Sequence, residues 1–260
     1  MTPLPAIFVS HGSPTLVLND VPAHDFLSGL GKSLGRPRAI IVVSAHYETG
    51  GVRVNTAARP RVIHDFYGFP QALYEMRYDA PGEPDLAADV VARLRAAGLE
   101  AEGDENWGFD HGTWVPLMLM YPDADIPVVA ISIDPEAGPH HHRRLGEALA
   151  PLRAEGVLIL GSGAFTHNLG ELRRGETAPL DAPDWVARFV DWTAAAIEEG
   201  RTDDLLHYRS RAPEAVRNHP TEEHFLPIFA ALGAGGGGKG RRLHTSTTFS
   251  VLAMDAYAFG

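Results

Sequence analysis

Cysteine is absent from the 260-residue chain. Disulfides, thiolate nucleophiles, iron–sulfur clusters and cysteine-held zinc are therefore excluded, and any metal ion must be bound by His, Asp or Glu. Basic residues are scarce, since 22 Lys and Arg stand against 33 Asp and Glu for a net charge of −11. That charge argues against nucleic acid or an anionic membrane as a partner.

Long apolar runs are also missing. No segment approaches the ~18 consecutive apolar residues of a membrane-spanning helix, and the first residues lack the basic and apolar regions of a signal peptide. We therefore expect a cytoplasmic protein. The hydrophobic content of 45% and the charged content of 21% are typical of a globular protein with a full core.

Apolar strand patterns alternate with amphipathic helix patterns along the chain, and no long linker or repeat divides it. The run Ala39–Val43 is apolar and β-branched, which is typical of a strand buried on both faces of a parallel sheet. We therefore predict one α/β domain over residues 1–260, with a central mostly parallel or mixed sheet flanked by helices. The expected strands are Ala6–Ser10, Ala39–Val43, Val52–Asn55, Pro127–Ile133, Val157–Leu160 and Phe249–Tyr257. The expected helices are Ala23–Leu34, Asp85–Ala97, Trp114–Met120, Gly138–Glu155, Asp184–Glu199 and Thr221–Leu232.

Three local features of these elements are also expected. Val52–Asn55 is short enough for a strand at the edge of the sheet. Thr221 is suited to cap the helix that it begins. The glycine-rich run Gly233–Gly240 lacks the strand before it and the Ser or Thr after it that a phosphate-binding loop requires, so we interpret it as a flexible connection.

Three of the expected strands each lead into a histidine: His11, His46 and His167. In open α/β sheets, the groups that carry chemistry lie beyond the carboxyl ends of strands. Neutral imidazoles are common metal ligands, so this pattern predicts a histidine-based metal site there, although no short HxxxH signature is present. His224 is a further candidate, because the start of a helix disfavours a protonated imidazole.

The other histidines give weaker indications. His64 and His111 lie in aromatic loops beside Asp65 and Asp110, and an acidic partner orients an imidazole where the two side chains meet. Three adjacent residues point in different directions on a helix, so His140–His142 cannot all bind one ion, and we interpret this run as a solvated face. Surface or satisfied core positions are expected for His24, His207, His219 and His244.

Seven blocks occur in order from residue 6 to the C-terminus: FVSHGSPTL, IIVVSAHYET, IHDFYGFPQALYEMRYDAPG, ENWGFDHGTWVPL, YPDADIPVVAISID, GSGAFTHNL and PTEEHFLPI. Together they resemble the 4,5-DOPA extradiol dioxygenase branch of the class III extradiol ring-cleavage dioxygenases, which are related to the catalytic subunit of protocatechuate 4,5-dioxygenase. The resemblance implies a single catalytic domain that opens the ring of a catechol, DOPA-like substrate with dioxygen. It also implies a mononuclear metal site, with Fe(II) in the active enzyme and Zn(II) as another bound metal.

The same resemblance implies roles for five histidines. His11 of HGSP, His46 of SAH and His224 of EHFLP are expected as metal ligands, and a glutamate takes the place of His224 in the protocatechuate branch. His167 of THNL is expected as the acid/base residue and as a fourth ligand, because it lies near enough to contact the metal. His111 of GFDHG is expected as a second catalytic residue, which binds substrate or assists proton transfer.

The expected substrate-binding residues are Tyr47, His64 and Ser13. An apolar wall around the substrate ring is also expected, and core packing explains its members equally well: Phe66, Tyr67, Phe69 and Trp107. Two other functions stay open, a zinc-dependent hydrolase or amidase on the same scaffold and a catalytically inactive metal-binding protein. The expected partners are a small catechol and O2, and the sequence is compatible with a monomer or a homodimer.

Overall fold

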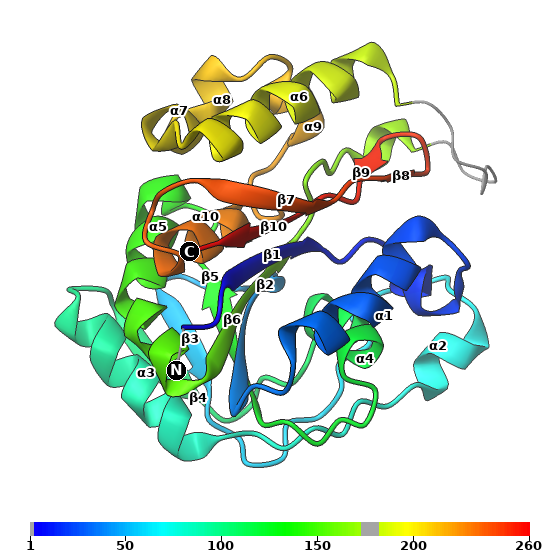
Figure 1. Ribbon diagram of the computed structural model, residues 1–260. Coiled ribbons are helices and arrows are strands. Elements are labelled where there is room, and N and C mark those ends of the chain that lie inside the picture. The colour runs from blue at the N-terminus through cyan, green and yellow to red at the C-terminus, as the bar shows by residue number, and fades with distance from the viewer. Residues whose placement is uncertain (1–2, 173–181) are drawn as a thin grey trace.

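One mixed β-sheet runs through the centre of the molecule (Figure 1). The computed structural model describes residues 3–172 and 182–260, and within them this sheet contains eight strands. In spatial order they are β4 (Ala101–Asp104), β3 (Val52–Asn55), β5 (Val128–Ile133), β2 (Ala39–Glu48), β6 (Val157–Gly163), β1 (Ala6–Ser10), β10 (Ala256–Phe259) and β7 (Gly240–His244). The central strands β5, β2, β6 and β1 are mutually parallel, whereas β10 pairs with β1 and β7 in antiparallel fashion. The predicted α/β fold with a mostly parallel or mixed sheet is confirmed.

Helices cover both faces of the sheet, as the apolar run in β2 requires. Successive residues of a strand point to opposite faces. Accordingly, Ile41 and Val43 pack in one hydrophobic core, whereas Ile40 and Val42 pack in the other. The first core includes residues of α3 (Pro84–Ala96), α5 (Gly138–Leu149) and α10 (Leu226–Ala234), and the second includes residues of α1 (Pro22–Leu34) and α4 (His111–Met120) (Figure 1).

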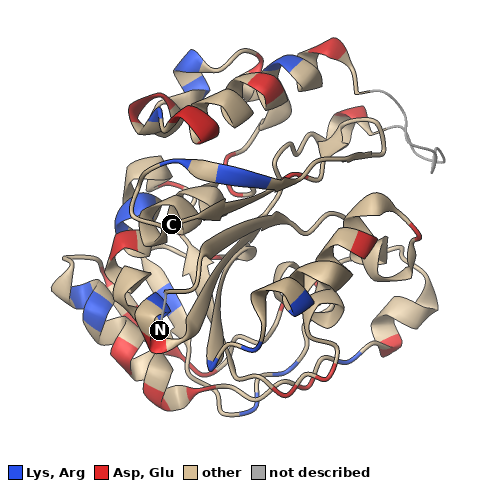
Figure 2. Ribbon diagram, viewed as in Figure 1, with Lys and Arg blue, Asp and Glu red and all other residues tan. Residues whose placement is uncertain are grey.

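The remaining elements lie around the rim of the sheet. Beyond β7 are α6 (Asp184–Glu199), α7 (Thr202–Leu206), α8 (Tyr208–Arg211) and α9 (Ala215–Asn218). The short elements are the 3₁₀ helices η1 (Pro14–Leu18), η2 (Ala150–Glu155) and η3 (Leu169–Glu171), helix α2 (Gln71–Glu75) and the hairpin of β8 (Thr247–Thr248) and β9 (Leu252–Ala253). Figure 2 shows charged residues mainly on the outer helices and on β7, whereas the central strands are tan. No helix in the described residues has both the length and the apolar character that crossing a bilayer requires.

Two glycines bring α5 and α10 into close contact. A Cβ atom at Gly146 would lie 2.0 Å from the carbonyl oxygen of Ala230, and one at Gly233 would lie 2.0 Å from that of Arg143. Any larger residue therefore forces the two helices apart. Because α10 begins at Leu226, shortly after His224 in the chain, this contact helps to hold the segment that carries that histidine.

We expect Gly146→Ala to lower the free energy of unfolding by at least about 2 kcal/mol, because the added methyl group overpacks the helix contact. In an unhindered helix the same change raises stability by about 0.5–1 kcal/mol. Gly29→Ala is the matched control, since a Cβ on this exposed residue of α1 meets no atom within 4 Å. Urea unfolding measures both changes, and a gain in stability for Gly146→Ala would contradict the close packing.

Phe249–Tyr257 does not form the expected continuous strand. Phe249 and Ser250 adopt left-handed backbone conformations with φ of 50° and 69°. The chain therefore turns between β8 and β9 and enters the main sheet again only at Ala256. Residues other than glycine rarely adopt positive φ, so the apolar pattern gave no sign of this turn.

The helix before the glycine-rich run, and the run itself, also differ from expectation. The helix begins at Leu226 and not at Thr221, whose hydroxyl donates to Glu223 instead of capping a helix. Gly233 belongs to α10 and Gly240 begins β7, a strand that was not predicted. The interpretation of Gly233–Gly240 as one flexible connection is therefore wrong at both ends.

Two further positions were predicted wrongly. Strand β3 does not lie at the edge of the sheet, because β4 pairs with it, and the polar sequence of β4 had given no strand signal.

His142 is buried and not solvated: its Nδ1 donates to the Gly138 carbonyl at 2.7 Å, and its Nε2 accepts from the Asp134 amide at 3.2 Å. Burial lowers the pKa of His142 to about 4, so this imidazole is a neutral core residue.

Candidate metal centre

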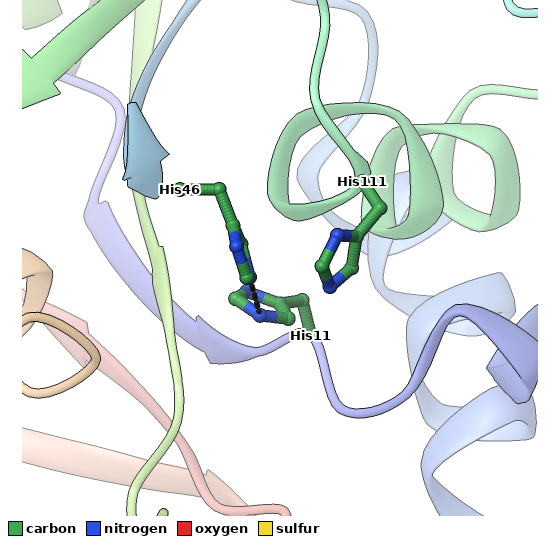
Figure 3. Close-up of side chains that lie close together, drawn as sticks. All are labelled: His11, His46 and His111. Carbon is green, nitrogen blue, oxygen red and sulfur yellow. Dashed lines mark hydrogen bonds between the residues drawn. The ribbon is translucent and has the colours of Figure 1, made fainter. Parts of the chain in front are cut away.

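Histidines from five separate segments line one cavity of about 570 Å³. His11 follows β1, His46 lies near the end of β2 and His167 follows β6. His111 is the first residue of α4 and not part of a loop, and His224 lies in the turn before α10. The cavity therefore lies at the carboxyl ends of the parallel strands, and Figure 3 shows three of its histidines side by side.

Small residues allow these segments to come together. A Cβ atom at Gly163 would lie 2.1 Å from the carbonyl oxygen of His224, and the same oxygen accepts a hydrogen bond from the Ala164 amide at 2.8 Å. A Cβ atom at Gly112 would lie 2.6 Å from the hydroxyl oxygen of Ser44 in β2. The glycines at the end of β6 and at the start of α4 thus allow His224 and His111 to lie close to the sheet.

Three imidazole nitrogens meet inside the cavity. The Nε2 atom of His46 lies 3.0 Å from Nε2 of His11 and 3.2 Å from Nε2 of His224. Figure 3 marks the first of these contacts with a dashed line. Nitrogens that bind one ion at about 2.1 Å each lie at such separations, so the distances fit a shared metal ion.

Carboxylates lie beside the Nδ1 atoms of two of these rings. The Nδ1 atom of His224 is hydrogen-bonded to Oε1 of Glu223 at 3.0 Å, and Nδ1 of His46 lies 3.3 Å from Oδ2 of Asp65. An ionised carboxylate only accepts hydrogen bonds. The Nδ1 atom of His224 therefore carries the proton and its Nε2 presents a lone pair to the cavity, and the charge of Asp65 beside Nδ1 of His46 favours the same tautomer there.

A serine fixes the tautomer of the third ring. Nδ1 of His11 lies 3.1 Å from the hydroxyl oxygen of Ser162, and that hydroxyl donates its only proton to the carbonyl oxygen of Gly112. The Nδ1 atom of His11 must therefore be the donor to Ser162. All three Nε2 lone pairs then face one another, an arrangement that a bound cation would stabilise.

His111 adds a fourth imidazole to this cluster. Its Nδ1 donates to Oδ2 of Asp65 at 2.9 Å, and its backbone amide donates to Oδ1 of the same residue at 2.9 Å. The ring centroids of His111 and His46 lie 3.8 Å apart. One nitrogen from each of His11, His46 and His111 lies within 4.8 Å of the other two.

His167 stacks on the ring of His224, with centroids 3.4 Å apart and ring planes 12° apart. Its Nδ1 lies 3.9 Å from Oε1 of Glu223. His167, Glu223 and His224 form a second group whose possible ligand atoms lie within 4.8 Å of one another. Burial and, to a smaller extent, the charge of His111 lower the pKa of His167 to about 4. The imidazole is therefore neutral near pH 7 and able to accept a proton.

The three converging imidazoles are also neutral. Burial is the main cause that lowers the pKa values of His11, His46 and His224 well below the ordinary value, and repulsion between neighbouring imidazoles lowers them further. Asp65 opposes the shift at His46. Burial by itself would raise the pKa of Asp65, but the hydrogen bonds from the side chain and backbone of His111 help to make the net shift downward. The site thus holds neutral imidazoles above an ionised carboxylate.

The structure separates the three expected substrate-binding residues. Ser13 lines the cavity, and its hydroxyl lies 3.0 Å from that of Thr15. Tyr47 does not line the cavity: its hydroxyl donates to Asp104 at 2.7 Å, and its ring stacks on Trp107. His64 lies outside the cavity as well, with Nε2 at 3.3 Å from the carbonyl oxygen of Met76.

Apolar side chains form much of the cavity wall. Phe66, Tyr67 and Phe69 of the expected aromatic wall line it, whereas Trp107 does not and donates instead to Asp110 at 3.1 Å. No sequence pattern pointed to the other large apolar residues that line the cavity, namely Leu169, Leu172, Phe249, Leu252 and Met254. A flat aromatic molecule is therefore the kind of ligand that this wall suits.

Sequence reasoning missed two residues that lie against the histidines, Glu223 and Ser162, and it placed a third, Asp65, beside the wrong histidine. Asp65 contacts His111 and His46 and not His64. Asp110 caps α4 through the Thr113 amide at 3.0 Å. The adjacency of Glu223 to His224 was the one available signal.

Three comparisons relate the chain to known proteins. A family model described as the catalytic LigB subunit of aromatic ring-opening dioxygenase matches residues 5–260. A 4,5-DOPA dioxygenase extradiol from Beta vulgaris is 40% identical over 97% of this chain and 95% of its own length. A protein of the same name from Escherichia coli (strain K12) is 42% identical over 90% of this chain and 86% of its own length. The crystal structure of an uncharacterized protein from Escherichia coli K12 matches with a TM-score of 0.80 at 32% identity, over 99% of this chain and 100% of that chain.

Proposed function

The chain belongs to the family of the catalytic LigB subunit of aromatic ring-opening dioxygenases, and on this basis we propose that it opens the ring of a DOPA-like catechol. It is an extradiol dioxygenase, which acts on a small aromatic molecule with O2. The observation that supports the proposed chemistry best is the meeting of three Nε2 lone pairs in a cavity with an aromatic wall.

The donor set fits a divalent metal ion, and members of this family depend on one. We propose His11, His46 and His224 as its protein ligands. Fe(II) is the proposed active metal, and Zn(II) also suits three neutral imidazoles. When bound, the ion would supply Lewis-acid polarisation of the catechol oxygens and the one-electron chemistry that dioxygen requires.

The chain's own residues position the substrate and move its protons. We propose that His167, neutral at pH 7, takes a proton from one catechol hydroxyl through a ring nitrogen. His111 presents Nε2 to the same cavity, because Asp65 holds its Nδ1–H, and we propose that it assists at the second hydroxyl. Phe66 and Phe69 would bind the ring face and exclude water from it.

Metal replacement separates this proposal from hydrolysis. After chelator treatment, Fe(II) is expected to restore ring cleavage, whereas Zn(II) is expected to bind without restoring it, because zinc has no redox chemistry. Oxygen uptake with a catechol, measured beside metal content, tests both statements. Restoration by Zn(II), or turnover that continues without oxygen, would favour the zinc-dependent hydrolase, which the relatives named as dioxygenases do not favour.

The substrate is tested by an oxygen-uptake screen of the Fe(II)-loaded enzyme against a panel of catechols that includes DOPA. A DOPA-like substrate is expected to give the highest kcat/KM, and the structure of the product shows whether cleavage is 4,5 or 2,3. Absence of oxygen uptake with every catechol would favour a catalytically inactive metal-binding protein. A single catalytic domain over residues 1–260, a cytoplasmic location and a monomer or homodimer remain predictions.

A further inference from the structure

Two carboxylates lie behind the histidine cluster, and each approaches two imidazoles. Oδ2 of Asp65 accepts from Nδ1 of His111 at 2.9 Å and lies 3.3 Å from Nδ1 of His46. The other oxygen, Oδ1, accepts from the backbone amide of His111. The Asp65 side chain is only 20% exposed. In this enclosed position its polar neighbours include the side-chain and backbone N–H groups of His111 and Nδ1 of His46.

Glu223 occupies the corresponding place on the other side of the cluster. Its Oε1 accepts from Nδ1 of His224 at 3.0 Å and lies 3.9 Å from Nδ1 of His167. The hydroxyl of Thr221 donates to the same oxygen at 3.0 Å. With a side-chain exposure of 15%, Glu223 is also enclosed.

The partners of the two carboxylates follow one rule. Each carboxylate pairs one proposed metal ligand with one proposed acid/base residue: Asp65 pairs His46 with His111, and Glu223 pairs His224 with His167. Within the described residues, every contact of these two carboxylates with a basic side chain is with a histidine. Burying a carboxylate is costly without a charged or hydrogen-bonded partner, so both carboxylates depend on these imidazoles for their enclosed positions.

On the basis of the proposed function, we propose that Asp65 and Glu223 are positioning residues, each of which orients one ligand and one acid/base imidazole and sets the tautomer of the imidazole that is hydrogen-bonded to it. A carboxylate accepts but does not donate, so His111 and His224 keep their protons on Nδ1 and turn Nε2 toward the cavity. The charge of the same carboxylates favours that tautomer in His46 at 3.3 Å and in His167 at 3.9 Å. Acidic partners of this kind raise the metal affinity of histidine ligands. Four of the five histidines are therefore arranged in two pairs, each beside its own carboxylate, and Ser162 orients the fifth, His11.

A structural role for Asp65 would be to support the start of α4, since its Oδ1 accepts from the backbone amide of His111, the first residue of that helix. The N-cap itself is Asp110, which accepts from the Thr113 amide at 3.0 Å. Loss of the Asp65 carboxylate should therefore change the imidazoles more than the stability of the helix.

The test is the tautomer of each imidazole, read from long-range ¹H–¹⁵N spectra of histidine-labelled protein. Asp65→Asn is expected to change the signals of His46 and His111 alone, and Glu223→Gln those of His224 and His167 alone. Each variant is also expected to bind Zn(II) about 10–100-fold more weakly by calorimetry. Asp125→Asn and Glu155→Gln, which alter surface carboxylates paired with Arg36 and Arg93, are the matched controls and should leave both readouts unchanged.

Wild-type signals and Zn(II) affinity within about twofold in both variants would overturn the proposal, and so would equal changes at all four imidazoles in either variant. If Asp65→Asn does not fold, Asp65→Glu replaces it, because the longer acid keeps an acceptor and should retain the Nδ1–H tautomer of His111. Neither readout requires ring cleavage. An enzyme with the expected tautomers but without oxygen uptake would therefore count against the proposed function and not against the positioning role.

Discussion

Replacing His11 with alanine is expected to lower the ring-cleavage turnover of the Fe(II)-treated enzyme at least about 1,000-fold. The change removes one of the three proposed Nε2 ligand atoms, of which those of His11 and His224 lie 3.0 and 3.2 Å from that of His46. A metal ion supplies several kcal/mol of transition-state stabilisation, and each 1.36 kcal/mol is a factor of ten in rate. His11 is almost fully buried, and the Ser162 hydroxyl holds its Nδ1, so its Nε2 faces the other two imidazoles.

Oxygen uptake and metal content after dialysis measure this loss. His24→Ala is the matched control, because His24 lies on α1 with a partner at the surface, Asp25, and lines no part of the cavity. His11→Gln keeps much of the side-chain volume. It therefore shows whether the loss comes from the missing nitrogen or from the cavity that His11→Ala leaves behind. Wild-type metal content together with turnover within tenfold of wild type would remove His11 from the proposed ligand set.

The centre of the fold was predictable because its strands are marked by composition. The strands β1, β2, β5 and β6 are apolar, β-branched runs, and such runs are buried on both faces of a sheet whatever the rest of the chain does. The rule that chemical groups lie beyond the carboxyl ends of parallel strands then brought His11, His46 and His167 to one edge. The histidines of this edge do line one cavity.

The orientation of individual side chains depended on where β2 ends. The sequence suggested that the strand ends at Val43, but it continues to Glu48. His46 and Tyr47 are consecutive residues of the extended strand, and they therefore point to opposite faces. His46 faces the cavity, whereas Tyr47 contacts Asp104 and Trp107. A longer strand would have predicted this separation from the sequence.

The carboxylates behind the histidines could not be assigned from the sequence. Asp65 is adjacent to His64, yet it bonds to His111, which is 46 positions away. Contacts of this kind depend on how the loop that carries Asp65 packs against the start of α4, and no periodic pattern records that packing. The turn at Phe249 and the polar strand β4 were missed for the same reason, since local composition says little about partners that are distant in sequence.

His167→Gln is expected to lower kcat at least about 100-fold while the protein keeps its metal. Glutamine retains hydrogen-bonding capacity and part of the volume of the imidazole, but it cannot accept a proton as a base. His167 is suited to that task because burial keeps it neutral, with a pKa lowered to about 4. Its ring lies flat against His224, so the change leaves the three converging Nε2 atoms of His11, His46 and His224 in place.

Single-turnover oxygen uptake, measured with enzyme loaded with Fe(II) without oxygen, separates the two roles that the sequence left open for His167. Loss of turnover with full metal content supports the acid/base role, whereas parallel loss of turnover and metal would identify His167 as a fourth ligand. His207→Gln is the matched control, because His207 lies at the surface beside Asp203 and outside the cavity. Turnover within about threefold of wild type in His167→Gln would show that this residue takes no part in the reaction. His111, the other cavity histidine that is not a proposed ligand, would then be the remaining acid/base candidate.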